Sequence, residues 1–217
     1  MVWELVRMLG GGAGRAGLIG IMAALLLLVA KLLPVGFGLL LLLLACLAGA
    51  VLLGKTRGLY IAHSALILFA GFGLLIHREE FGLIWMIWLV LVVAGTDVFG
   101  YFAGRIIGGP KFWPRISPKK TWSGTVAGWI CAGIVGAGFM KLTGSGVELI
   151  GISVALSIAS QIGDITESAL KRRVGVKDSS TLLPGHGGVF DRFDGMLGAA
   201  LLLFLVESLT EFPPMPL

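Results

Sequence analysis

Charged residues crowd a stretch of about 30 residues that lies between two apolar segments. The first half of this stretch places four polar side chains at i, i+3, i+4 and i+7, which is one face of a helix: Asp164, Glu167, Ser168 and Lys171. Asp191 and Asp194 follow at i, i+3 and share a second face. Two helix ends that carry carboxylates can meet around a cation. Hard oxygen ligands, with cysteine absent and histidine scarce here, favour Mg²⁺ over zinc.

Basic side chains surround these carboxylates: Lys171, Arg172, Lys177 and Arg192. A metal bridges phosphate oxygens, and cations neutralise the charge that develops on a leaving group. The combination indicates a polyphosphate site. A buried ion pair that holds two helices together is the alternative for any single acid, but several acids beside two basic loops favour function. The sequence contains no Walker A motif, which argues against a P-loop ATPase.

A glycine-rich connector, residues 175–188, joins the two halves of the stretch. Glycine lets the backbone approach a phosphate closely and offer N–H donors. An ordinary turn is the alternative, although the position between "KRRVGVKD" and "DRFD" favours a binding role. His186 in this connector can donate to a phosphate or make a hydrogen bond within the loop, and the sequence does not separate the two.

The elements that carry these residues are membrane helices. The chain has 217 residues, of which 57% are hydrophobic and 13% charged, whereas soluble domains carry about 25% charged residues. A membrane helix needs about 20 mostly apolar residues. We therefore predict an all-α, polytopic integral membrane helical bundle, with residues 1–217 forming a single membrane domain. About seven transmembrane helices are expected, at residues 16–33, 35–53, 58–76, 81–104, 122–141, 146–166 and 189–209.

The basic residues predict how this bundle is oriented. With seven spans, 14 of the 17 Lys and Arg residues fall at one end, and Lys31, Arg78 and Lys141 fall at the other. Basic residues collect in cytoplasmic loops of membrane proteins. We expect the active site and two catalytic loops, 105–121 and 168–190, to face the cytoplasm. Because membrane topology explains the basic pI, no nucleic acid partner is expected.

The first basic loop has features of its own. Five Lys and Arg residues lie among Pro and Trp in "GRIIGGPKFWPRISPKKTWSG", and contact with lipid headgroups is one explanation. The segment "SPKKT" precedes a helix that Thr121 or Ser123 can cap, so the helix N-terminus favours an anion. We take Ser117 and Lys120 as candidates for contact with a nucleotide or lipid phosphate.

The segment from Ser168 to Asp194, "SALKRRVGVKDSSTLLPGHGGVFDRFD", resembles the signature of CDP-diacylglycerol synthases (phosphatidate cytidylyltransferases) over its 27 positions. "TDVFGYFAGRIIGG" and "SPKKT" also look like segments of that family, and the resemblance covers roughly residues 1–210. It implies an enzyme of phospholipid biosynthesis that joins CTP and phosphatidic acid into CDP-diacylglycerol and releases pyrophosphate. It also implies a homodimer in a bacterial inner membrane.

The resemblance assigns residues to roles. Asp164 and Asp191 match acids that bind a metal centre of Mg²⁺ and a second cation, K⁺, and Ser168 and Lys171 match residues of the same site. In our hypothesis Lys171 and Arg172 screen the two anionic substrates from each other. The departing pyrophosphate is stabilised by one of two basic residues, Lys177 or Arg192. The remaining candidates orient these cations or bind metal through water: Asp178 and Asp194.

The sequence departs from the family pattern at two places. The opening "MVWELVRMLGG" resembles a segment that in relatives follows a hairpin of two membrane helices, so we expect that hairpin to be missing. Ser123 stands where relatives often carry Glu or Gln, and it receives no role.

Two alternative functions stay open. A CTP-dependent lipid kinase shares the general chemistry. A non-enzymatic ion transporter would spread its acids through the bilayer depth, whereas these acids cluster at one end.

Overall fold

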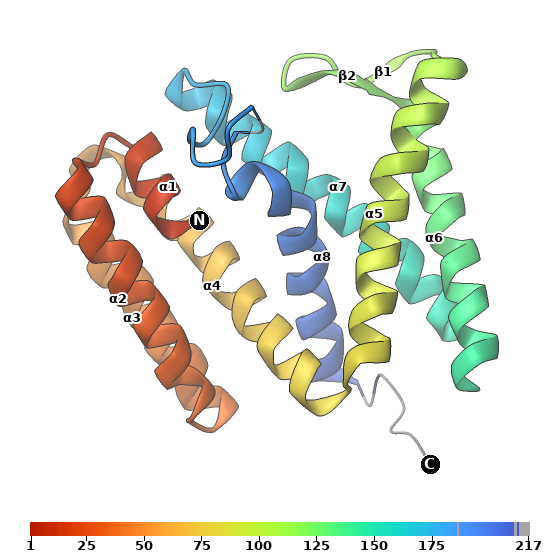
Figure 1. Ribbon diagram of the computed structural model, residues 1–217, viewed down its shortest axis with the longest axis horizontal. Coiled ribbons are helices and arrows are strands. Elements are labelled where there is room, and N and C mark those ends of the chain that lie inside the picture. Colours follow the sequence, from red (N-terminus) through yellow and green to blue (C-terminus); the bar gives the residue numbers. More distant parts are fainter. Residues whose placement is uncertain (186, 211, 213–217) are drawn as a thin grey trace.

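The protein is described by a computed structural model that places residues 1–185, 187–210 and 212. Seven of its helices, side by side in Figure 1, correspond to the predicted spans. They are α2 (Ala13–Lys31), α3 (Val35–Val51), α4 (Arg57–Glu80), α5 (Leu83–Ile106), α6 (Trp122–Thr143), α7 (Glu148–Val174) and α8 (Phe190–Leu209). The predicted all-α membrane bundle is confirmed.

The described helices differ in how clearly they qualify as spans. Five are long and apolar enough to cross a membrane: α2, α4, α5, α6 and α7. Helix α3 is equally apolar but has 17 residues, and α8 carries Asp191, Arg192 and Asp194 in its first turns. Three of the predicted site residues thus lie at the start of α8, the bundle helix whose first turns depart most from a plain membrane span.

Helix α7 continues well past the predicted end at residue 166. Its last turns have the sequence ESALKRRV, which is rich in strong helix formers. Gly175 then ends the helix in the left-handed conformation, with φ of 76°. The helix therefore carries the whole face from Asp164 to Lys171 without a break.

A short helix and a β-hairpin lie at one end of the bundle (Figure 1). Helix α1 (Val2–Met8) is short and packs against α2 and α4. Strands β1 (Lys111–Trp113) and β2 (Ser117–Thr121) form an antiparallel hairpin between α5 and α6. The connector between α7 and α8 lies at this same end, and the last described residues lie at the opposite end. The fold thus gathers both predicted catalytic loops on one side of the bundle.

Glycines allow two pairs of helices to touch through their backbones. A Cβ atom on Gly124 of α6 would meet the carbonyl oxygen of Gly100 on α5. A Cβ atom on Gly163 of α7 would meet the carbonyl oxygen of Asp194 and the backbone of Gly198 on α8. Small residues permit this close packing between membrane helices. The second crossing is important for the site, because α7 and α8 carry Asp164 and Asp191.

Helix α8 contributes to both apolar cores of the bundle. Phe190, Leu197 and Phe204 belong to the core formed with α1 to α4, where Phe204 meets Phe72 edge to face. Ala199 and Leu203 belong to the second core, around Trp88 of α5. Burial on several faces holds α8 in place, even though its first turn is charged.

Candidate active site

Asp191 lies in the first turn of α8 and accepts hydrogen bonds on both carboxylate oxygens. Lys171 Nζ lies 2.8 Å from Oδ1, and the backbone N–H of Gly188 donates to Oδ2 at 2.7 Å. Ser179 donates through its backbone N–H and its hydroxyl, at 2.9 to 3.1 Å. Charge-assisted hydrogen bonds of this kind are short and directional. They fix the carboxylate and tie both ends of the glycine-rich connector to it.

Lys171 joins Asp191 to a third charged residue, Glu167. The ammonium group makes ion pairs with both carboxylates, and Glu167 lies one helical turn before it. The Glu167 side chain is 1% exposed, Asp191 9% and Lys171 15%. Sequence spacing placed Glu167 on the same face as Lys171, but the sequence analysis gave it no role. The structure shows it as a buried partner of a candidate catalytic lysine.

Asp164 makes a separate set of contacts. Ser168 donates its hydroxyl to Oδ1 at 3.2 Å, which confirms the shared helix face. Lys120 of β2 pairs with Oδ2 at 2.5 Å, so the hairpin is joined to α7 at this point. The Asp164 side chain is 30% exposed and that of Lys120 is 25% exposed. Three of the predicted site residues therefore meet here.

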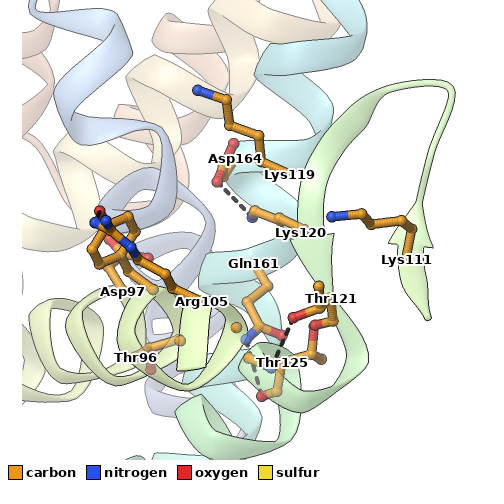
Figure 2. A pocket seen from close by; sticks show the side chains of 14 residues that line it. Thr96, Asp97, Arg105, Lys111, Lys119, Lys120, Thr121, Thr125, Gln161 and Asp164 are labelled. Atoms are coloured by element: carbon orange, nitrogen blue, oxygen red, sulfur yellow. Dashed lines mark hydrogen bonds and ion pairs between the residues drawn. The ribbon is translucent and has the colours of Figure 1, made fainter. Parts of the chain in front are cut away.

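A pocket of about 510 Å³ opens beside Asp164, between α5, the hairpin, α6 and α7. Figure 2 shows Lys120 directed at Asp164, with Lys111 and Lys119 on the hairpin nearby. Arg105 and Asp97 come from α5. Pockets of 300 to 1,000 Å³ are typical of small-molecule sites. The size and the basic lining suit an anionic ligand.

The inner wall of this pocket is held by hydrogen bonds. Gln161 Oε1 accepts from the Trp129 indole at 3.0 Å, and its amide nitrogen donates to the Thr125 carbonyl at 3.3 Å. Thr121 caps α6 by accepting from the Gly124 N–H at 3.3 Å, which confirms one of the two predicted caps. Ser123 instead donates to the Gly108 carbonyl at 2.5 Å and closes the base of the hairpin. These contacts fix the pocket wall before any ligand binds.

Two more carboxylates lie within electrostatic range of Asp164. They are Asp97 of α5, whose side chain is exposed in the pocket, and Asp194 of α8, whose Oδ1 accepts the Gly195 N–H at 2.7 Å. The sequence analysis did not assign Asp97 to the site. In the part of the chain that the structure describes, no three acidic, His or Cys side chains are close enough together to hold a metal ion. Of the carboxylates at this end of the bundle, Asp164, Glu167 and Asp191 are paired with lysines.

The remaining predicted residues that the structure describes lie on the same elements as these two networks or in the connector. Arg172, Lys177 and Asp178 have exposed side chains at the end of α7 and in the connector, and Arg192 is exposed on α8. Ser117 is half-buried in β2. His186 lies outside the described residues. The structure therefore joins Lys171 to Asp191, and Lys120 and Ser168 to Asp164, as two neighbouring clusters.

Comparison with known proteins shows to which protein family the chain belongs. A family model described as "Cytidylyltransferase family" matches residues 1–209. A phosphatidate cytidylyltransferase of Brucella suis biovar 1 (strain 1330) is 47% identical over 142 residues, which are 64% of this chain and 52% of that protein.

Proteins of the same name from two other bacteria are also similar to the chain, at lower identity. The phosphatidate cytidylyltransferase of Helicobacter pylori (strain ATCC 700392 / 26695) is 41% identical over 66% of this chain and 54% of that protein. That of Bacillus subtilis (strain 168) is 39% identical over 60% of this chain and 50% of that protein. The chain spans about half the length of the curated relatives it matches. The predicted resemblance is confirmed, and the chain belongs to the cytidylyltransferase family.

Proposed function

We propose that the protein is a phosphatidate cytidylyltransferase, which converts CTP and phosphatidic acid into CDP-diacylglycerol and pyrophosphate. One observation carries the proposal: Lys120 of the hairpin and Asp164 of α7 meet in the wall of a basic pocket at the end of a membrane bundle. The names of the relatives support it. A water-soluble anion and a lipid anion can both reach such a position.

The surroundings of the pocket suit two different substrates. Arg105, Lys111 and Lys119 give its lining positive charge, which attracts the triphosphate of CTP. Beside the charged mouth, Ile106 is 79% exposed and Trp113 is 47% exposed. Exposed apolar and Trp side chains are typical of the boundary between membrane and water. We propose that phosphatidic acid reaches the pocket from the lipid at this boundary.

The reaction as proposed forms one bond and breaks one. A phosphate oxygen of phosphatidic acid attacks the α-phosphorus of CTP, and the bond from that phosphorus to the pyrophosphate oxygen breaks. The attacking phosphate is already anionic, so no strong general base is required. The main barrier is the approach of two anions, which fixed cations lower by electrostatic stabilisation. We assign this role to Lys171 and Arg172, and stabilisation of the pyrophosphate to Lys177 or Arg192.

We further propose that the site uses Mg²⁺ with K⁺ as a second cation, held by Asp164 and Asp191. Carboxylate and hydroxyl oxygens are the donors that Mg²⁺ prefers, and Asp164 has Ser168 beside it. A metal would compete with Lys120 and Lys171 for these carboxylates. Bound ions of this kind polarise phosphoryl oxygens. Asp178 and Asp194 remain candidates for orienting the cations or binding metal through water.

The proposal extends to location and assembly. We propose that the protein lies in the bacterial inner membrane as a homodimer, with both loops in the cytoplasm, because 14 of the 17 Lys and Arg residues are at the loop end. Single cysteines at Lys111 and Lys177 should be protected from an impermeant thiol reagent in intact cells, in a background without Cys46 and Cys131. A cysteine at the exposed Arg78, at the other end, should react. The reverse pattern would overturn the orientation.

CTP labelled at different phosphates distinguishes a cytidylyltransferase from a lipid kinase. Purified protein is incubated with phosphatidic acid and Mg²⁺, and with CTP labelled either at the α- or at the γ-phosphate. A cytidylyltransferase transfers the α-label to the lipid and releases the γ-label in pyrophosphate. A CTP-dependent lipid kinase would transfer the γ-label to the lipid instead. Chelation of Mg²⁺ should stop the transfer, and added Mg²⁺ should restore it.

A further inference from the structure

Glu4 of the short helix α1 lies under the connector that precedes α8, more than 170 residues away in sequence. Its side chain is fully buried. Oε1 accepts the Ser180 hydroxyl at 2.7 Å and the Val189 N–H at 2.8 Å, and Oε2 accepts the Phe190 N–H at 3.0 Å. A further contact comes from the residue before its own helix, Met1, whose amino group lies 3.3 Å from Oε2. Figure 1 shows α1 at the same end of the bundle as this connector.

These contacts supply the cap that α8 lacks in its own sequence. The N-cap residue of α8, Val189, has no side chain that can accept a hydrogen bond, so the first N–H groups of the helix need an outside partner. A carboxylate is the preferred partner, because the helix dipole is positive at this end. Glu4 therefore caps α8 from a different helix.

Glu4 and Asp191 hold the same connector from two sides. Asp191 binds the N–H groups of Ser179 and Gly188, and Glu4 binds the next groups along the chain, at Ser180 and Val189. Gly188 lies between the two carboxylates. A Cβ atom there would touch Glu4 and the hydroxyls of Ser179 and Ser180. The packing around Gly188 thus leaves no room for a side chain between Glu4 and the two serine hydroxyls.

We propose that Glu4 is a positioning residue for the active site. It fixes the start of α8, and so the place of Asp191, whose backbone follows directly after the capped N–H of Phe190. The inference rests on the proposed function for its effect on turnover, but the contact itself can be measured without substrate. No part of α1 touches the pocket beside Asp164, so Glu4 acts through the connector.

Hydrogen exchange and kinetics of a Glu4→Ala variant test this role. Losing a hydrogen bond to a charged group should speed exchange at the Val189 and Phe190 amides about tenfold or more. Turnover should fall about 10- to 100-fold, as is typical when the partners that orient metal ligands are removed. The Mg²⁺ concentration for half-maximal rate should rise, whereas KM for CTP should stay near wild type, because CTP is assigned to the pocket beside Asp164.

Two further variants separate positioning from simple destabilisation. Val6→Ala removes an equally buried but apolar side chain from the same helix, so it should lower stability without changing the Mg²⁺ requirement. Glu4→Gln keeps the shape and one accepting oxygen, so it should recover part of the turnover and part of the protection. An equal rise in the Mg²⁺ requirement in Val6→Ala would contradict the proposal.

The remaining outcomes are also decisive. Wild-type exchange at Val189 and Phe190 in Glu4→Ala would overturn the proposal, whatever happens to turnover. If that variant does not accumulate in membranes, Glu4→Gln decides by the same measurement. If the wild-type protein makes no CDP-diacylglycerol, the proposed function fails, and the exchange rates still show whether Glu4 holds α8.

Discussion

The two candidate metal-binding acids lie in opposite kinds of surroundings. Asp191 is nearly buried, and the connector, Lys171 and Ser179 occupy both of its oxygens. Asp164 is 30% exposed, faces a pocket and is paired with Lys120 on a hairpin. One acid is built into the fold, and the other is available to a ligand. Two acids that are assigned to one metal centre therefore lie in different settings, a rigid anchor for Asp191 and a pocket wall for Asp164.

The physical difference between the two regions lies in desolvation. Removing one partner of a buried ion pair leaves an uncompensated charge and is strongly destabilising. An exposed pair contributes little, because water and salt compensate for its loss. Lys171 is shared by two buried carboxylates, whereas Lys120 lies at the edge of a pocket. Substitutions at the two sites should therefore affect stability and activity in different proportions.

The largest effects should come from the acids themselves. Asp164→Asn and Asp191→Asn should each lower turnover about 100- to 1,000-fold, the range seen when one preorganised electrostatic contact is removed. The two variants should differ in hydrogen exchange: Asp191→Asn should speed exchange at the connector amides of Ser179 and Gly188, and Asp164→Asn should not. Equal exchange in both variants would remove the distinction between anchor and ligand site.

A double variant tests whether Asp191 acts as a metal ligand or as an ion-pair partner. If Asp191 mainly balances the charge of Lys171, with which it pairs, the combination Asp191→Asn with Lys171→Gln should recover turnover. We expect this protein to stay inactive at every Mg²⁺ concentration. Near-normal turnover in the double variant would exclude the metal role.

The next largest effect should be on stability. Lys171→Met leaves Glu167 and Asp191 buried without their shared cation, which should cost about 3 to 5 kcal/mol of unfolding free energy. Lys120→Met breaks a partly exposed pair and should cost less than about 1 kcal/mol. Reversible unfolding in mixed micelles measures both. Adding Glu167→Gln to Lys171→Met should restore part of the loss, and equal costs for the two lysines would contradict the comparison.

The smallest effect should come from the cations at the pocket mouth. Lys111→Gln and Lys119→Gln should each raise KM for CTP about two- to fivefold, the size expected for an exposed charge interaction. The difference from wild type should shrink at high salt, because salt screens exposed charges. Lys31→Gln, at the far end of the bundle, is the matched control and should leave KM unchanged. A salt-independent change would show that these lysines act through structure.

Local spacing predicted those parts of the site that lie on one helix. The i, i+4 spacing of Asp164 and Ser168 led directly to the observed hydrogen bond, and the apolar runs gave the seven bundle helices. The pairing of Lys120 with Asp164 depends on how the hairpin folds back onto α7. No periodicity in the sequence contains that information.

The role of Glu4 could not be predicted either, because its contacts join segments that are even further apart in the sequence. Its partners Val189 and Phe190 lie at the other end of the chain, and a single glutamate in an apolar helix has no spacing pattern to distinguish it. One signal was available: a fully apolar N-cap before α8 leaves backbone donors that must find an acceptor. The metal ligands and K⁺ stay predictions, because side-chain placement alone does not test them.

The glycine crossing between α7 and α8 sets a limit on how far these two helices can move when a ligand binds. Gly163 precedes Asp164 directly, and its partner Gly198 lies two turns after Asp191. Since the two backbones already touch, the helices cannot come closer, and sliding along each other would drive carbonyl oxygens into Cα atoms. The fold therefore fixes the distance between the backbones that carry Asp164 and Asp191. If a ligand binds between these two acids, we expect the lysine side chains and the hairpin to adjust to it.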